Sequence, residues 1–263
     1  MRKITFLGTG GGRFVLLTQR RYSGGLWLEF DETTIAIDPG PGALVRALQF
    51  GKNPSKLDAV LVSHNHLDHY NDAEVMIEAM TAGVKQKKGL LVTTQETLSY
   101  ISDYHKNAVE VITPKPMEKF KVNGLEVMAL QTHQHVNAIG FKFFTEKGIV
   151  TYTSDTSYKE NLSENYKDSK ILIINTICPQ SRDIETHLNT LGAMKLIQEA
   201  KPETAVITHF GMQMLNAIPE REAALIEKKT GIRTIAAKDG MVLDLEKNPE
   251  KEEIENQLKL DKF

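Results

Sequence analysis

The sequence predicts an α/β domain whose mixed β-sheets are covered by helices. Short apolar segments rich in β-branched residues recur in both halves of the chain, and turn residues separate them. Segments with a helical period of 3.6 residues lie between these apolar runs. Because strands dominate both halves and helices are interspersed, we expect the helices to pack on the faces of the sheets.

The strands follow from the apolar runs and the turns between them. Asp31 and Glu32 separate two such runs and predict a hairpin turn, and Glu146, Lys147 and Gly148 form a second turn. The expected strands are residues 4–7, 26–30, 33–37, 59–62, 90–93, 125–130, 140–144, 149–153, 171–174, 205–207, 232–236 and 241–245.

The helices follow from amphipathic spacing. We expect one helix over 191–200 with Thr190 as N-cap, and a longer helix over 212–229 that Gly231 closes. Residues 43–50 and 73–82 are further helices. A charged segment at 249–260 predicts a surface helix within residues 248–263. With no linker or repeat to divide it, the chain is expected to form a single domain over 1–263.

Composition limits the class of protein. The formal net charge of −2 argues against a strongly basic nucleic-acid-binding surface, so a nucleic-acid partner is not favoured. A single cysteine, Cys178, excludes an intramolecular disulfide. The first apolar run is too short for a signal-peptide core, and no stretch approaches the roughly 20 apolar residues of a membrane span. We therefore expect a cytoplasmic protein without a membrane segment.

The most informative segment spans residues 64–69, which read His-Asn-His-Leu-Asp-His just after an expected strand. Imidazole and carboxylate are ligands of zinc and other first-row metals. Because alternate side chains of an extended segment point the same way, His64 and His66 are placed to bind one ion together. Asp68 and His69, beyond a turn, are placed to face a second ion.

Other candidate ligands also follow expected strands. Asp155 follows 149–153, His209 follows 205–207, and both His133 and His135 follow 125–130. Each has a structural alternative: Asp155 as a helix cap, or His209 as a buried histidine without chemistry. All four residues follow an expected strand, and strand ends at one sheet edge bring their side chains together. This repeated placement favours their role as metal ligands over the structural alternatives.

These motifs together resemble the metallo-β-lactamase superfamily, in its phosphodiesterase or RNase Z-like branch. The spacing of His64, His66, Asp68 and His69 is the hallmark of that superfamily. Further similarity lies in Gly8-Thr9-Gly10, in the turn at 38–42, in 151–156 and in 208–211. The resemblance implies a four-layer αβ/βα sandwich with the site at one edge of two central sheets.

The resemblance also implies a ligand set for two divalent metal ions. One ion takes His64, His66 and a third histidine; the other takes Asp68, His69 and His209; Asp155 bridges them. The third histidine is His133 or His135, and the distance to Gly140 favours His133. Zinc is the expected metal, and Mn, Fe or Ni suit the same ligands.

The implied activity is hydrolysis by a hydroxide bound to the two metals, which Asp68 helps to orient. A phosphodiester is the favoured substrate: a cyclic nucleotide, a small cyclic phosphate or an RNA end. His187 is similar to a histidine that faces the scissile phosphate in RNase Z, where it serves as an acid or stabiliser. An equally favoured interpretation is that His187 only precedes the helix over 191–200 and has no role in catalysis.

Two alternatives use the same fold. A lactone or thioester hydrolase would use the same metal site. A diiron redox protein is less favoured, because that branch is expected to carry a glutamate where His66 stands.

Overall fold

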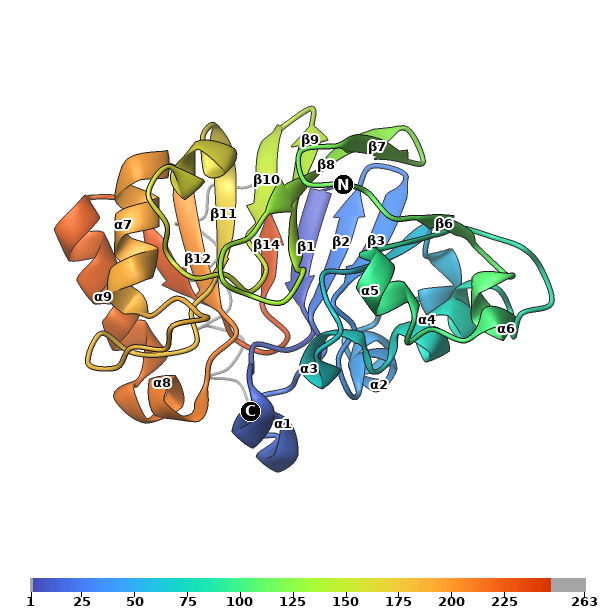
Figure 1. Ribbon diagram of the computed structural model, residues 1–263, viewed down its shortest axis with the longest axis horizontal. Coiled ribbons are helices and arrows are strands. Elements are labelled where there is room, and N and C mark those ends of the chain that lie inside the picture. The colour runs from blue at the N-terminus through green and yellow to red at the C-terminus, as the bar shows by residue number, and fades with distance from the viewer. Residues whose placement is uncertain (1, 247–263) are drawn as a thin grey trace.

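A computed structural model describes residues 2–246, and two seven-stranded mixed sheets form its centre. The sheets lie face to face, and helices cover both outer faces (Figure 1). The predicted α/β class, with mixed sheets flanked by helices, is confirmed. The surface helix predicted within 248–263 lies outside the described residues. No described helix is long and apolar enough to cross a membrane.

The first sheet contains the N-terminal half of the chain and the last described strand. Its neighbours are antiparallel from β14 to β3 and parallel from β3 to β6. In spatial order its strands are β14 (Val242–Asp244), β1 (Arg2–Phe6), β2 (Leu26–Phe30), β3 (Thr33–Ile37), β4 (Ala59–Val62), β5 (Leu90–Thr93) and β6 (Glu110–Ile112).

The second sheet repeats this arrangement with the C-terminal half. Its neighbours are parallel from β13 to β10 and antiparallel from β10 to β7. In spatial order its strands are β13 (Thr234–Ala236), β12 (Thr204–Thr208), β11 (Ser169–Asn175), β10 (Gly148–Tyr152), β9 (Ile139–Thr145), β8 (Leu125–Gln131) and β7 (Lys119–Val122).

Helices cover the two outer faces and the loop edge of the sheets. The described α-helices are α1 (Arg13–Thr18), α2 (Ala43–Gln49), α3 (Leu67–Tyr70), α4 (Ala73–Met80), α5 (Gln95–Leu98), α6 (Asp103–Lys106), α7 (Thr190–Ala200), α8 (Met212–Ala217) and α9 (Pro219–Thr230). Short 3-10 turns lie at Pro54–Lys56 and Leu162–Tyr166.

Three apolar cores hold the layers together. The largest lies between the sheets, where Phe6 and Leu28 of one sheet and Phe141 and Phe143 of the other are fully buried. A second core packs α7 and α9 on the second sheet, and a third packs α2 and α4 on the first. Burial of apolar area on both faces of each sheet is the main stabilising contribution to such a layered fold.

The structure differs from the sequence prediction in several elements. The helix expected over 212–229 is two helices, because Pro219 lacks a backbone N–H and disfavours helical geometry at Ile218, whose φ is 67°. The N-cap of α7 is Asn189, whose side chain accepts from the N–H of Gly192, and not Thr190. The sequence prediction also missed β6 and β7, which are short strands at the far edges of the two sheets.

Candidate metal centre

The predicted ligands gather where loops leave the two sheets at one edge. His64 and His66 follow β4, Asp68 and His69 lie on α3, and the remaining ligands follow strands of the second sheet. Because β4 and the strands β10 and β12 end at the same edge, loops far apart in sequence meet there, near α1 and α3 (Figure 1).

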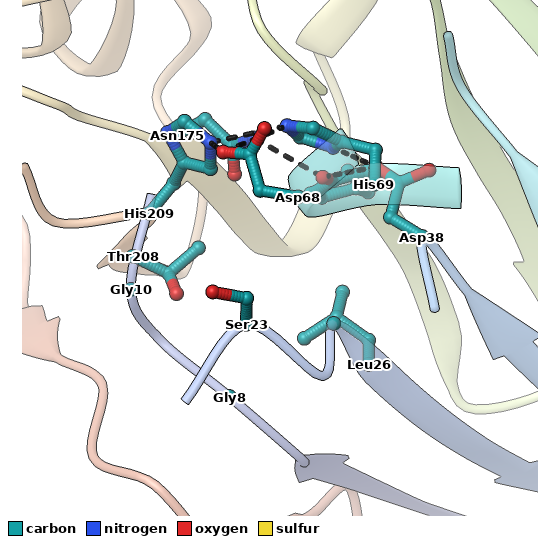
Figure 2. Close-up of a pocket in the computed structure, with 12 residues that line it drawn as sticks. Gly8, Gly10, Ser23, Leu26, Asp38, Asp68, His69, Asn175, Thr208 and His209 are labelled. Carbon is teal, nitrogen blue, oxygen red and sulfur yellow. Dashed lines mark hydrogen bonds and ion pairs between the residues drawn. The ribbon is translucent and has the colours of Figure 1, made fainter. Parts of the chain in front are cut away.

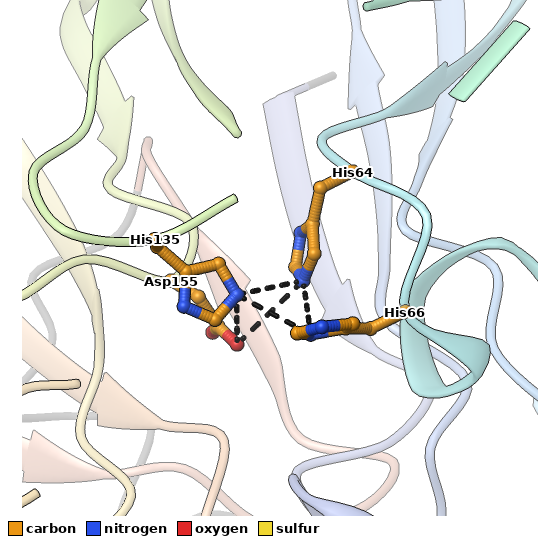
Figure 3. A group of neighbouring side chains, drawn as sticks. All are labelled: His64, His66, His135 and Asp155. Carbon is orange, nitrogen blue, oxygen red and sulfur yellow. Dashed lines mark hydrogen bonds and ion pairs between the residues drawn. The ribbon is translucent and has the colours of Figure 1, made fainter. Parts of the chain in front are cut away.

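One group of side chains consists of His64, His66, His135 and Asp155 (Figure 3). Nε2 of His64 lies 3.0 Å from Nδ1 of His66 and 3.1 Å from Nε2 of His135. Oδ2 of Asp155 lies 3.6 Å from Nε2 of His135 and 3.8 Å from Nε2 of His64. Three imidazole nitrogens and one carboxylate oxygen therefore converge on one point.

A second group consists of Asp68, His69 and His209 (Figure 2). Nε2 of His69 lies 3.1 Å from Nε2 of His209, which lies 3.3 Å from Oδ2 of Asp68. Oδ2 of Asp155 is also 3.4 Å from Nε2 of His69. The same carboxylate oxygen therefore faces both groups.

The third histidine of the first group is His135, whereas the sequence analysis favoured His133. Among the described residues, His133 belongs to neither group. Its backbone N–H donates to Oγ1 of Thr156 and its carbonyl accepts from the N–H of Ser157, each at 2.9 Å. The chain then turns at Gln134, whose φ is 49°, and carries His135 to the cluster. The path of this loop therefore decides which histidine joins the first group, and the number of residues between the histidine and Gly140 does not.

Hydrogen bonds fix which nitrogen of each imidazole faces the centre. Asp38 accepts from Nδ1–H of His69 at 2.9 Å and from the hydroxyl of Ser63 at 2.8 Å. The Ser63 oxygen, 2.9 Å from Nδ1 of His64, is then left to accept from that nitrogen. Nδ1 of His135 donates to the carbonyl of Thr186 at 3.1 Å. In all three rings Nε2 is therefore the nitrogen that faces the cluster, and it presents a lone pair there when the ring is neutral.

This donor set fits divalent metal ions. The Nε2 lone pairs of His64 and His135 face each other at 3.1 Å, and two such lone pairs repel unless a cation lies between them. Asp38 and Asp155 are almost fully buried, and buried carboxylates are costly without a counter-charge. Two divalent cations would satisfy both requirements, and imidazole with carboxylate is a ligand set that Zn²⁺ accepts.

The charges of the site act on the histidines in opposite directions. Burial lowers the pKa of His64 well below its usual value and lowers the pKa of His135 to about 4, so both rings are neutral at pH 7. Burial opposes protonation of His69 too, but the carboxylates of Asp155 and Asp68 raise its pKa well above the usual value. The carboxylates thus favour positive charge at the centre, whereas burial keeps the ligand nitrogens of His64 and His135 unprotonated.

Asn175 holds the Asp155 carboxylate that the two groups share, and Tyr152 links Asn175 to Asp38. The amide Nδ2 of Asn175 lies 2.7 Å from Oδ1 of Asp155 and 3.1 Å from the oxygen of Tyr152, and it donates to both. The Tyr152 hydroxyl donates to Asp38 at 2.7 Å. Asn175 ends an apolar strand as the predicted ligands do, and this signal could have identified it. Nothing in the sequence around Tyr152 could have predicted its contact with Asp38.

The glycine run at 10–12 contacts the second group. A side chain at Gly11 would overlap the His209 ring, since a Cβ atom there would lie 2.3 Å from Nδ1. The N–H of Gly12 donates to Oδ2 of Asp68 at 2.7 Å. These glycines therefore permit close approach of the backbone to the site. Figure 2 shows the small cavity of about 20 Å³ beside this group, which Asp38, Asp68 and His209 help to line.

His187 lies at the outer side of the centre. Its Nε2 is 3.2 Å from Oδ2 of Asp155, and its Nδ1 is 2.8 Å from the hydroxyl of Thr186. Its ring centroid lies 4.7 Å from that of His135. The structure thus brings together His187 with six of the seven residues predicted as ligands, namely His64, His66, Asp68, His69, Asp155 and His209.

Comparison with known proteins decides the family. The family model for a β-lactamase superfamily domain matches residues 33–210, which is more than half of the chain and includes both groups of side chains. The chain belongs to the β-lactamase superfamily. The protein MJ1374 of Methanocaldococcus jannaschii is 34% identical over 92% of this chain and 95% of its own length.

Other relatives of this β-lactamase superfamily domain have more descriptive names. The probable metallo-hydrolase YhfI of Bacillus subtilis is 25% identical over 79% of this chain and 86% of its own. Ribonuclease Z of Methanopyrus kandleri is 30% identical over 54% of this chain and 50% of its own. The chain thus spans about half of that ribonuclease, and the similarity covers only that part.

Solved structures agree on the β-lactamase superfamily fold. The crystal structure of YhfI superposes with a TM-score of 0.78 at 20% identity, over 92% of this chain and 98% of YhfI. A diphosphatase from the PhnP family superposes with a TM-score of 0.69 at 18% identity, over 92% of this chain and 97% of its own. At these identities the likeness establishes the fold alone.

Proposed function

We propose that this chain is a metal-dependent hydrolase of phosphodiesters. The observation that carries the proposal is Oδ2 of Asp155, which faces both groups of ligand atoms, at 3.4 Å from His69 and 3.6 Å from His135. A carboxylate shared by two adjacent ligand groups is typical of a dinuclear site. Relatives named as a metallo-hydrolase and as ribonuclease Z support the reaction class.

Each group of side chains has a role in this proposal. One ion would be held by His64, His66 and His135, and the other by Asp68, His69 and His209. Asp155 lies between the two groups and would serve both. Two such ions supply Lewis-acid polarisation of the phosphoryl oxygen and a water of lowered pKa. The Gly12 N–H holds the carboxylate of Asp68, which would orient the attacking water.

His187 donates a proton to the leaving oxygen. Its Nε2 lies 3.2 Å from Asp155 and its Nδ1 lies against Thr186, and the side chain is partly exposed, so a substrate at the centre has access to it. Proton donation to a poor leaving group contributes about 10²–10⁴-fold to such reactions. Hydrolysis of a phosphodiester releases an alkoxide, which is a poor leaving group, so a histidine that protonates it accelerates the reaction.

Hydrolysis of a lactone or thioester is the second candidate, because the same ligand groups polarise a carbonyl as well as a phosphoryl oxygen. The favoured choice rests on the ribonuclease Z relatives and on His187. A metal centre alone does not discriminate between the two substrates.

The test starts from protein purified without added metal. We would measure bound metals by mass spectrometry and then assay bis(p-nitrophenyl) phosphate hydrolysis after addition of Mn²⁺ or Zn²⁺. We expect about two ions per chain, as a dinuclear site requires, and activity that the metal restores. Asp68→Ala should abolish activity, whereas Asp103→Ala, which removes an exposed carboxylate on α6, should not.

Two outcomes would contradict the proposal at different levels. Two ions without phosphodiester turnover, but with turnover of a lactone or thioester, would move the function to the second candidate. Fewer than one ion per chain after reconstitution, or full activity in the presence of a strong chelator, would exclude the metal centre itself.

A further inference from the structure

A cavity of about 410 Å³ lies beside the metal centre, between loop 183–189 and the first turns of α7. Its volume falls within the range of about 300–1,000 Å³ that is usual for small-molecule sites. It is distinct from the small cavity of Figure 2, which lies at the second ligand group.

The cavity is adjacent to the proposed reaction site, and His187 contacts both. His187 lines it, and Nε2 of the same residue is 3.2 Å from Oδ2 of Asp155. Gln134, the neighbour of His135, lines it as well and lies 3.0 Å from the hydroxyl of Ser157. A phosphodiester at the ligand groups has this cavity within reach of an ester group that extends past His187.

The walls of the cavity are held by hydrogen bonds within the chain. The side chain of Asn189 accepts from the N–H of Gly192 at 2.8 Å and donates to the carbonyl of Arg182 at 2.9 Å. The N–H of Ile177 donates to the carbonyl of Leu188 at 3.0 Å. Because these bonds join the loop to α7 and to the end of β11, the cavity is formed before a ligand arrives.

The lining combines polar residues with the apolar Ile184, Leu188 and Leu191, and its charged side chains include more acid than base. Asp183 and Glu185 contribute carboxylates, and Lys195 contributes one ammonium, which lies 4.9 Å from the centre of the Tyr158 ring. Carboxylates accept hydrogen bonds from hydroxyl groups, as the acidic residue of dinucleotide-binding folds does with ribose. They repel a further phosphate, which provides selection against charged ester groups.

We propose that this cavity binds an uncharged, hydroxyl-bearing ester group, a sugar or nucleoside, of the phosphodiester substrate. Asp183 and Glu185 discriminate against ester groups that carry additional phosphates, so small diesters are preferred to polynucleotide chains. This inference rests on the proposed function and names the substrate class of the same site.

Gly192 offers a direct test of the cavity. A Cβ atom there would lie 3.5 Å from Cβ of Tyr158 and 3.0 Å from Cδ2 of Leu188, the end of a flexible side chain. Gly192→Leu therefore adds bulk at the wall of the cavity with a small local shift. Asp183→Asn combined with Glu185→Gln changes the charge of an exposed loop without a change in volume.

The experiment measures binding to zinc-reconstituted protein by calorimetry, with three probes: methyl phosphate, uridine 5′-monophosphate and uridine 3′,5′-bisphosphate. The uridine monophosphate should bind about tenfold or more tightly than methyl phosphate, and the bisphosphate should bind more weakly than the monophosphate. Gly192→Leu should reduce the preference for uridine monophosphate over methyl phosphate about tenfold. The double variant should reverse the discrimination against the bisphosphate.

Binding is measured apart from turnover, so the two proposals fail separately. Absence of bis(p-nitrophenyl) phosphate hydrolysis by the zinc protein would contradict the proposed function. The cavity proposal would be overturned if uridine monophosphate binds no better than methyl phosphate, or if Gly192→Leu, folded by circular dichroism, keeps the full preference. Tighter binding of the bisphosphate than of the monophosphate would overturn the charge discrimination.

Discussion

The side-chain amide of Asn175 donates a hydrogen bond of 2.7 Å to Oδ1 of Asp155. This bond occupies one oxygen of the carboxylate and turns the other, Oδ2, toward His69, His135 and His187 at 3.2–3.6 Å. The two residues follow or end adjacent parallel strands of the second sheet. Backbone pairing of β10 with β11 therefore sets the orientation of the residue that both ligand groups share.

Removal of this amide should weaken metal binding. We predict that Asn175→Ala lowers metal affinity about 10–100-fold, as is usual when a group that orients a ligand is lost. Competition with a chromophoric chelator measures the change. Asn107→Ala, at an exposed asparagine on the end of α6, should bind metal as the unmodified protein does. Equal affinities of the two variants would contradict the role of Asn175.

Two buried tyrosine hydroxyls should respond differently to removal. Tyr152 donates to Asp38 at 2.7 Å, and burial, together with Asp38 and Asp155, raises its pKa so that it keeps its proton. Tyr152→Phe should cost about 1–3 kcal/mol of unfolding free energy, since the Asp38 carboxylate loses a partner. Tyr166 is equally buried, but its hydroxyl has no hydrogen-bond partner among the described residues. Tyr166→Phe should be neutral or stabilising.

Urea denaturation of both variants provides the measurement, and each serves as control for the other. An equal loss of unfolding free energy in Tyr166→Phe and Tyr152→Phe would contradict a stabilising contribution from the hydrogen bond between Tyr152 and Asp38.

Neighbouring histidines of one loop should differ in their effect on metal content. His135→Ala removes a nitrogen 3.1 Å from Nε2 of His64 and should lower metal affinity by about tenfold or more. His133→Ala should leave metal content unchanged, because the contacts of His133 with 156–157 use its backbone. Mass spectrometry after dialysis against a weak chelator tests both variants. Loss of metal from His133→Ala alone would reverse the assignment.

A role of His187 as a proton donor predicts a dependence on the leaving group. His187→Ala should reduce hydrolysis of a methyl diester about 10²–10⁴-fold. Hydrolysis of a p-nitrophenyl ester should fall far less, since p-nitrophenolate leaves without a proton. Metal content should not change. An equal loss for both esters, or a loss of metal, would indicate instead that His187 positions Asp155, from which it lies 3.2 Å.

Elements with a strong local pattern could be predicted from the sequence. The strands β2, β3, β4 and β5 have the expected bounds, because each is an apolar run between clear turns. The break at Pro219 follows a local rule that the amphipathic period of 212–229 obscured. β7 is short and alternates exposed and buried residues, so its apolar signal is weak.

The sequence by itself determined the fold class and the motif from His64 to His69, since both depend on residues close in the chain. Only the tertiary structure decided that His135, and not His133, reaches the first group. It also brought Asn175 to Asp155 and placed the cavity of loop 183–189 beside His187. The physical reason is that these contacts depend on loop paths held by partners distant in the sequence, such as Thr156, 23 residues from His133, and Thr186, 51 residues from His135. The spacing of residues within one segment does not indicate which distant residues will hold that segment in place.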